Sequence, residues 1–263
     1  MHYLKPIILA AAIVPATASA QTALTTTDYA QNFDTLAASG STGTALPAGW
    51  AIKETGTNAN ASYGIGDGSS NAGNTYSFGT TGSTDRALGS LASGSLSSMY
   101  GVLFTNGLDS TITAFDIAYV GEQWRLGNST NDGLTFEYST DATSLTNGTW
   151  IKVSALDFLP AILTGTQGAL NGNLAANQRD LAATIDGLSI AAGGNFGFRW
   201  TDLDSTGTDH GLGIDDFSVK ATLATSAGAV PEPATWGMII LGFGAMAGAV
   251  RRRGRTAARV RFA

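Results

Sequence analysis

Residues 134–139 read LTFEYS, and this hexapeptide is the clearest indication of the fold. Its apolar side chains alternate with polar ones at a period of two, which is the pattern of an antiparallel strand with one buried face. Residues 196–201, FGFRWT, repeat the alternation with aromatic rings on one side. Two such strands predict a sheet that buries its aromatic face against a second layer.

Further strand-like runs lie on both sides of these two stretches, separated by turns rich in Gly, Asn and Asp. They cover residues 30–36, 50–52, 75–78, 98–104, 111–119, 150–155, 182–188 and 213–221. Gly121 is expected to end the run at 111–119, and residues 54–74 and 160–180 are expected to be loops. So many short strands, with few helical patterns, predict an all-β antiparallel sandwich over residues 21–221.

The β region also resembles a known fold. Residues 134–141 (LTFEYSTD), Trp150 and the closing residues 214–219 (IDDFSV) resemble strands of extracellular jelly-roll modules, whose final strand commonly carries an Ile-Asp-Asp-Phe/Val signature. The resemblance implies a jelly-roll-like antiparallel β-sandwich. It says little about a ligand, because one fold serves many functions.

The N-terminus predicts export. Lys5 gives a small positive region, residues 7–14 are apolar, and residues 18–20 (ASA) are small at the positions that a signal peptidase reads. Residues 1–20 are therefore expected to be a signal peptide that is cleaved before Gln21.

A second targeting segment lies near the C-terminus, where residues 230–253 read VPEPATWGMIILGFGAMAGAVRRR. The uncharged run from 234 to 250 is 17 residues long, at the short end for a helix that spans a bilayer. Trp236 stands where an interfacial aromatic belongs, and the arginines at the far end predict the cytoplasmic side. We therefore expect a transmembrane helix at 234–250, with everything before it outside the cytoplasmic membrane.

The order of these features resembles the PEP-CTERM sorting segment of Gram-negative bacteria. The matching residues are Pro231, Glu232, Pro233, Trp236, Arg251, Arg252 and Arg253. The resemblance implies an exosortase, a membrane thiol transpeptidase that processes the segment near Pro-Glu-Pro and releases or re-anchors the mature protein. An ordinary C-terminal membrane anchor is the alternative. The expected layout after the β region is a linker (222–230), the sorting segment (231–253) and a basic cytoplasmic tail (254–263).

Charge and cysteine content narrow the function of the mature region. Residues 21–230 contain 7 Lys or Arg against 19 Asp or Glu, a net charge of −12. A domain this acidic is a poor nucleic-acid binder, because phosphate contacts need Lys and Arg. It suits a soluble secreted surface or a host for cations. The chain has no Cys, which excludes disulfides, thiol catalysis and thiolate metal sites.

The densest polar cluster is TDLDSTGTDHGLGIDD at residues 201–216, which suggests a calcium site between sandwich loops. Calcium takes several hard oxygen ligands from flexible loops. The candidate ligands are Asp202, Asp204, Asp209 and Asp215. A helix-loop-helix calcium hand does not fit, because the twelfth position from Asp202 is Gly213 rather than Glu. The alternative is a solvated acidic turn whose Asp side chains bond their own backbone. No other cofactor is indicated.

The sequence indicates no catalytic site. His210, the one histidine left after signal cleavage, is accompanied by no Gly-x-Ser-x-Gly nucleophile elbow. The mature region has three glutamates, Glu54, Glu122 and Glu137, and they do not form the closely spaced acidic motif of sandwich-fold glucanases. A glycan hydrolase would need two of the distant carboxylates to meet in space.

Residues 121–125 (GEQWR) are a weak candidate for a ligand-binding face, together with the Arg199-Trp200 pair. Sugar-binding faces combine aromatic rings with polar partners, because sugar CH faces stack on rings while hydroxyls need hydrogen bonds. The candidate residues are Glu122, Trp124, Arg125 and Trp200. The interpretation that the sequence favours is an inter-strand ion pair, of Glu122 with Arg125 or Arg199, over a core tryptophan.

Three functions follow from these interpretations. The first is an exported surface or extracellular-matrix protein, held transiently in the membrane, whose β domain binds polysaccharide or a matrix component. The second is an exported glycan hydrolase, and the third is a purely structural matrix protein. An exposed groove lined by Trp124 or Trp200 favours the first two, whereas burial of both rings in the core favours the third.

Overall fold

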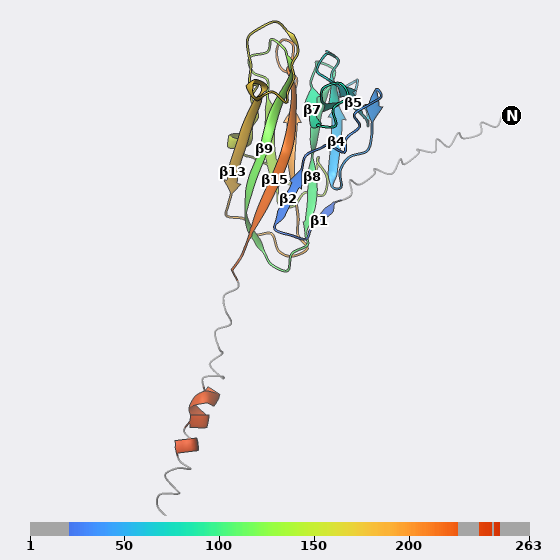
Figure 1. Ribbon diagram of the computed structural model, residues 1–263. Coiled ribbons are helices and arrows are strands. Elements are labelled where there is room, and N and C mark those ends of the chain that lie inside the picture. The colour runs from blue at the N-terminus through green and yellow to red at the C-terminus, as the bar shows by residue number, and fades with distance from the viewer. Residues whose placement is uncertain (1–20, 226–236, 244, 248–263) are drawn as a thin grey trace, which may run out of the picture. The chain divides into compact units, whose positions relative to one another are not determined.

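The computed structural model describes residues 21–225, 237–243 and 245–247. The chain forms two compact units, Met1–Ala224 and Thr225–Ala263. All described strands belong to the first unit (Figure 1). The last strand ends at Leu223, so the β domain extends two residues past the expected boundary at residue 221.

The described elements are almost all strands, which confirms the all-β prediction. The strands are β1 (Thr22–Leu24), β2 (Asp28–Gln31), β3 (Thr42–Gly43), β4 (Trp50–Thr55), β5 (Tyr63–Gly66), β6 (Asn74–Phe78), β7 (Ala87–Leu91), β8 (Ser97–Asn106), β9 (Ile112–Leu126), β10 (Leu134–Ser139), β11 (Ile151–Lys152), β12 (Gly168–Ala169), β13 (Gln178–Ile185), β14 (Asn195–Asp202) and β15 (Gly211–Leu223). Two 3-10 helices, η1 (Ser154–Leu156) and η2 (Ala175–Asn177), lie in the connections.

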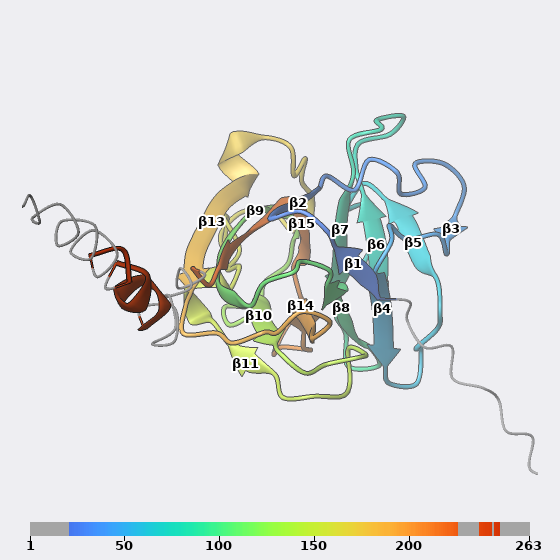
Figure 2. The ribbon, with the colours of Figure 1, turned by 90° about the horizontal axis from the view of Figure 1, so that it is seen from below.

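These strands form two sheets that face each other. The six-stranded sheet, here sheet A, has the order β1-β8-β14-β10-β11, with β4 also paired to β8. The nine-stranded sheet, here sheet B, has the order β12-β9-β15-β7-β6-β5-β3, with β13 on β9 and β2 on β15. Figure 2 shows β10 and β14 in one layer and β9 and β15 in the other. The pairs β1–β8 and β5–β6 are parallel.

The main core fills the space between the sheets. β10 and β14 pair in register from Leu134–Asp202 to Ser139–Gly197, so the two alternating stretches are neighbours. Trp200 is fully buried, with its ring centroid 5.3 Å from that of Tyr119 and 5.2 Å from that of Phe217, both on sheet B. Burying a large apolar side chain stabilises a fold by roughly 1.5–3 kcal/mol, so this aromatic layer holds the sheets together.

A smaller core lies on the outer face of sheet B. It consists of Tyr76, Phe78, Ala87, Leu91 and Trp124. Strand β7 contributes to both cores. Leu88 belongs to the main core, and Ser90 on the same face bonds Asp202 of sheet A. Ala87 and Leu91, on the other face, belong to the smaller core. Because successive side chains on a strand point to opposite faces, the smaller core lies on the side of sheet B that faces away from sheet A.

The prediction that Gly121 ends a strand was wrong. β9 runs without a break from Ile112 to Leu126. Glycine is needed at this position because a Cβ on Gly121 would lie 2.4 Å from the ring of Phe158. Glycine therefore allows close packing inside the strand rather than a turn.

Other element boundaries also differ from the predictions. Residues 54–74, expected to be a loop, contain β5, and β7 was not anticipated. The run at 30–36 leaves the sheet after Gln31, and Phe33 has a φ of 56° with its side chain fully buried. The run at 150–155 contributes only the two-residue β11 before η1 begins.

The predicted targeting segments at the two ends of the chain lie largely outside the described residues. These include the signal peptide (1–20), Pro231, Glu232, Pro233, Trp236, Arg251, Arg252, Arg253 and the basic tail (254–263). Part of the expected helix at 234–250 is described as helical, at residues 237–243 and 245–247. Within the described stretches, no helix has the length and apolar character needed to cross a membrane.

Candidate functional site

Trp124 and Trp200, the rings proposed as sugar platforms, are both fully buried. Trp200 lies in the main core, where it also stacks on Trp50 at a centroid distance of 6.0 Å. Trp124 stacks on Phe78 at 5.9 Å. Neither ring offers a face to a ligand, so the prediction of an exposed platform at these positions was wrong, and the core interpretation holds.

The loop after residue 160 covers Trp124. The Leu170 N–H donates to the carbonyl of Trp124 at 2.8 Å. A Cβ on Gly172 would lie 2.4 Å from the indole ring, so the backbone at Gly172 lies directly against it. The long Gly/Asn-rich excursion therefore encloses the tryptophan rather than forming a mobile arm.

Glu122 is buried beside this ring. Its Oε2 accepts a hydrogen bond from Trp124 Nε1 at 2.9 Å, and its Oε1 accepts one from Gln178 Nε2 at 2.9 Å. Burial raises the pKa of Glu122, and the charges of Asp85 and Asp216 add to this effect. Glu122 therefore serves as a hydrogen-bond acceptor that orients Trp124.

The ion pair predicted for Glu122 is not formed. Arg125 instead donates from Nη1 to the carbonyls of Gly68 and Ser69, at 3.0 and 3.1 Å. Within the described residues, the ion pairs join Lys152 to Asp157 and Arg199 to Glu137. The partner of Arg199 is therefore Glu137 on the neighbouring strand β10, directly opposite Arg199 in the strand register.

The four aspartates predicted to bind calcium do not form a common site. Asp202 is fully buried and accepts a hydrogen bond from Ser90 Oγ at 2.6 Å. Asp209 accepts from the Ser205 N–H and Asp215 from the Asp216 N–H, while Asp204 is exposed. Across the described residues, no group of three or more His, Asp or Glu is arranged to hold a metal ion. Asp209 and Asp215 bond backbone N–H groups close by in the chain, as the turn alternative predicted, whereas the partner of Asp202 lies on another strand, β7.

His210 has a structural role. Its ring is fully buried, and its Nδ1 accepts hydrogen bonds from the Gly127 N–H at 3.0 Å and from Gln123 Nε2 at 2.9 Å. The Nε2–H then donates to the Ser129 carbonyl at 3.0 Å. Both ring nitrogens are occupied, so the imidazole is not free to act as a base on a ligand.

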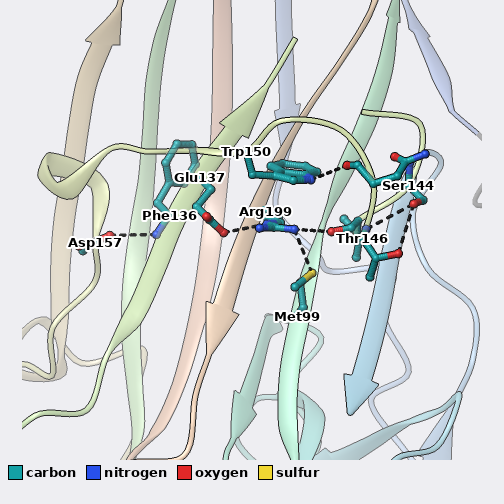
Figure 3. A network of polar contacts seen from close by, with 10 residues as sticks. Met99, Phe136, Glu137, Ser144, Thr146, Trp150, Asp157 and Arg199 are labelled. Carbon is teal, nitrogen blue, oxygen red and sulfur yellow. Dashed lines mark hydrogen bonds and ion pairs between the residues drawn. The ribbon is translucent and has the colours of Figure 1, made fainter. Parts of the chain in front are cut away.

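An aromatic side chain that the sequence did not single out as a ligand contact lies on the outer face of sheet A. Trp150 is half-buried, and its ring lies over the Arg199 guanidinium, 4.2 Å from Cζ to the ring centroid (Figure 3). Arg199 Nε donates to Glu137 Oε2 at 2.8 Å. We call these three residues the Trp150 platform.

Arg199 is fixed from several sides. Its Nη1 donates to the Leu145 carbonyl and lies 3.6 Å from Met99 Sδ (Figure 3). The Arg199 and Glu137 side chains are only 13% and 19% exposed. A guanidinium held this firmly gives the ring above it a rigid base, and a cation under the indole is itself favourable.

The loop between β10 and β11 brings Trp150 back over the sheet. Asp141 accepts hydrogen bonds from the Thr149 N–H and from Ser139 Oγ, each at 2.7 Å, and these bonds lower the pKa of Asp141. Gly148 supplies a φ of 80° at the turn. Trp150 Nε1 then donates to the Asn147 carbonyl at 2.7 Å, which fixes the plane of the indole.

A polar hollow adjoins the platform on the same face. Its volume is about 370 Å³, and its lining includes Thr135 and Thr201. These two threonines are paired across β10 and β14, one pleat along from Glu137 and Arg199. Asp204 and the exposed Leu203 line the same hollow. Sheet A thus presents the Thr135 and Asp204 side chains on the same face as the half-buried Trp150 indole.

A larger groove, of about 730 Å³, lies on the outer face of sheet B, across β2, β15, β9 and β13. Its floor is made of small side chains with charged neighbours; the lining includes Ala30, Ala118, Ala182, Ser218, Asp28, Asp116 and Lys220. Its aromatic residue, Tyr29, packs against Phe104 and accepts a hydrogen bond from Trp50 Nε1. This groove therefore offers no free ring for stacking.

The carboxylates named for a hydrolase lie on opposite sheets. Glu122 is on β9 of sheet B, and Glu137 is on the outer face of β10 in sheet A. Glu54 accepts hydrogen bonds from Thr75 N and Oγ1 and from Asn60. These three glutamates do not face one another across a shared groove.

Comparison with known proteins identifies the C-terminal segment. The family model of the PEP-CTERM protein-sorting motif matches residues 229–253. This chain carries a PEP-CTERM sorting motif. The motif implies export, a C-terminal anchor before cleavage and processing by an exosortase, and therefore an exported surface protein. The prediction made from Pro231 to Arg253 is confirmed.

Solved structures similar to this PEP-CTERM protein are distant. They include the xylan-binding CBM22-1 domain of Paenibacillus barcinonensis Xyn10C (9% identity, TM-score 0.35, 75% of this chain and 95% of that one) and TmCBM61 in complex with beta-1,4-galactotriose (10%, 0.32, 66% and 88%). Another is the enzymatically active domain of bacteriophage CBA120 tailspike protein 4 (9%, 0.34), of which the match covers 19%. Similarities this weak do not indicate a ligand. No curated protein sequence matches the chain significantly.

Proposed function

We propose that this exported protein binds a neutral polysaccharide at the Trp150 platform and the adjoining hollow, without catalysis. In this proposal its C-terminal segment holds it in the membrane until an exosortase-type enzyme processes it, and the β domain then acts at the cell surface or in the extracellular matrix.

The observation that carries the proposal is the half-exposed Trp150 ring, fixed over Arg199. A sugar ring stacks its CH face on an indole, and its hydroxyls need donors and acceptors close by. Glu137 and Thr135 supply such groups on the same face. The two sides of the platform thus match the two kinds of surface that a sugar presents.

The test compares full-length protein with its Trp150→Ala variant by affinity gel electrophoresis in xylan, galactan, mixed-linkage β-glucan and dextran. We expect retardation in at least one polysaccharide, and a loss of about tenfold in affinity on removing the ring. Ile151→Ala is the matched control, because Ile151 is the next residue in the chain and its side chain is exposed, at 45%. Equal retardation of the wild type and Trp150→Ala contradicts the platform, and no retardation in any gel contradicts polysaccharide binding.

A structural matrix protein is the second candidate, and burial of both Trp124 and Trp200 favours it. In that case the β domain acts through its stability and its acidic surface rather than through a ligand. Full-length protein that binds none of the polysaccharides but is retained in the extracellular matrix after export supports this candidate over the first.

A further inference from the structure

Arg86 is a buried arginine without a carboxylate partner. It directly precedes β7, its residue is only 2% exposed, and within the described residues no carboxylate oxygen lies within 4.0 Å of its nitrogen atoms. A buried charge is costly unless it is paired and fully hydrogen-bonded. The charges of Asp85 and Asp67 offset part of this cost, but neither carboxylate bonds the guanidinium directly.

The guanidinium is only partly satisfied by its neighbours. Nε donates to Ser77 Oγ at 2.9 Å, and Nη2 donates to the Ser77 carbonyl and, at 3.5 Å, to the Gly66 carbonyl. Nη1 makes no hydrogen bond to any described residue. Because a guanidinium carries five N–H donors, both donors on Nη1 are left for another partner.

Gly79 leaves room for the Nη1 end of the Arg86 guanidinium. A Cβ on Gly79 would lie 2.1 Å from Arg86 Nη1, so only glycine at this position admits the guanidinium. Ser77 is held in turn, because its Oγ donates to the Ala37 carbonyl at 2.9 Å. The arginine is thus fixed in one orientation before any ligand arrives.

A pocket of about 510 Å³ opens at this position, and Arg86 is part of its lining. Apart from Ile65, the other lining residues are small or polar; they include Ser39, Gly40, Asp67, Ser69 and Thr81. A volume of this size accommodates a small organic ligand. Asp67 accepts a hydrogen bond from the Ser69 N–H, which leaves its second carboxylate oxygen as an acceptor at the pocket wall.

We propose that this pocket binds an acidic sugar, with the sugar carboxylate on Arg86 Nη1 and its hydroxyls on Asp67, Ser39 and Thr81. A carboxylate is the natural partner of a fixed guanidinium. A bare anion suits the pocket less well than a uronic acid, because Asp67 repels an anion but accepts hydrogen bonds from hydroxyls. The site lies on sheet B and its loops and is separate from the Trp150 platform.

The experiment measures binding of sodium D-glucuronate to the full-length protein by isothermal titration calorimetry, beside D-glucose and sodium acetate. We expect heat of binding with glucuronate and none with glucose. Acetate that binds as well as glucuronate overturns the acidic-sugar assignment and indicates a plain carboxylate site. Absence of any glucuronate binding overturns the proposal.

Two variants at the mouth of the pocket keep the test independent of folding. Ser39 is exposed, so Ser39→Glu and Ser39→Gln are expected to fold alike. The added negative charge in Ser39→Glu weakens glucuronate binding roughly threefold or more relative to Ser39→Gln. Equal affinities of the two variants contradict a carboxylate in this pocket.

Arg86→Lys tests whether the planar guanidinium of Arg86 is needed for binding. Loss of the planar guanidinium removes a charge-assisted hydrogen bond and reduces affinity about tenfold. Trp150→Ala leaves glucuronate binding unchanged, so failure of this site and failure of the polysaccharide platform are distinguishable. Glucuronate binding that follows Trp150 instead of Arg86 places the ligand on the platform and overturns the pocket.

Discussion

The outer faces of the two sheets carry the same three residue types and use them differently. On sheet B, Glu122, Trp124 and Arg125 lie within four consecutive residues, yet the tryptophan is fully buried and the two charges do not pair. On sheet A, the Trp150 platform draws its members from β10, β14 and the loop before β11, and its ring stays half-exposed. The difference comes from what covers each face: a long loop lies over Trp124.

The largest contrast expected is in stability. Trp124→Ala removes a fully buried indole and its hydrogen bond to Glu122, and we expect it to lower the free energy of unfolding by about 3–5 kcal/mol. Trp150→Ala removes a half-exposed ring and is expected to cost about 1 kcal/mol or less. Urea unfolding monitored by circular dichroism measures both. Similar losses in the two variants contradict the distinction between a covered and an open face.

The packing of sheet B predicts the next effect. Gly121→Ala places a methyl group against the Phe158 ring inside a continuous strand, and we expect a loss of roughly 1–3 kcal/mol in the free energy of unfolding. Gly82→Ala is the comparison, because no atom lies within 4 Å of a Cβ there, although the φ of 80° adds backbone strain. An unchanged urea midpoint for Gly121→Ala sinks the argument that this glycine exists for packing.

Two buried carboxyl groups, those of Asp215 and Asp209, predict a pH dependence. Burial raises the pKa of Asp215 to about 9, with the charges of Glu122 and Asp216 adding to the shift, and burial raises the pKa of Asp209 to about 6. A carboxyl whose pKa is raised on folding stabilises the protein most below its unfolded pKa, and that stability is lost as pH rises through the folded value. Between pH 5 and 8 we expect the free energy of unfolding to fall, by up to about 1.4 kcal/mol per pH unit for Asp215.

The control for this prediction is Asp215→Asn, which cannot ionise. Its urea midpoint is expected to depend less on pH between 5 and 8 than that of the wild type. A wild-type midpoint that rises across this range contradicts the raised pKa values.

The smallest effect expected is within the platform. Arg199→Lys keeps the charge but loses the planar contact with Trp150 and the fixed geometry toward Glu137, at a cost of about 0.5–1 kcal/mol. Tryptophan fluorescence is the second readout, because Trp150 gains exposure to water while Trp124 and Trp200 remain enclosed. An unchanged emission spectrum means that Arg199 does not position the ring.

Local patterns in the sequence were sufficient for the fold class. Alternation in residues 134–139 and 196–201 predicted strands that proved to be β10 and β14, paired with each other. The C-terminal motif was readable because all its features lie within one short segment. Such features depend on neighbours in the chain, which a sequence displays directly.

The candidate sites depended on contacts that the sequence does not display. In the sequence, Trp150 shows only the pattern of a strand residue. A binding role could have been inferred only from its place in the loop after Glu137, together with the pairing of Glu137 and Arg199 across two strands. Nothing in the sequence pointed to Arg86, because only the folded structure shows that no carboxylate bonds its guanidinium. Conversely, the GEQWR stretch looked like a binding face because nothing in it shows that the loop after residue 160 folds over it.

The sequence by itself determined that this is an exported, acidic, cysteine-free β protein with a sorting motif, because period-two alternation, composition and contiguous signals are local properties. Only the tertiary structure decided which tryptophans are core and which is open, which glutamate pairs with Arg199, and that Arg86 has a free donor edge. Those outcomes rest on which strands become neighbours and which loop covers which sheet. They are set by packing between residues tens of positions apart.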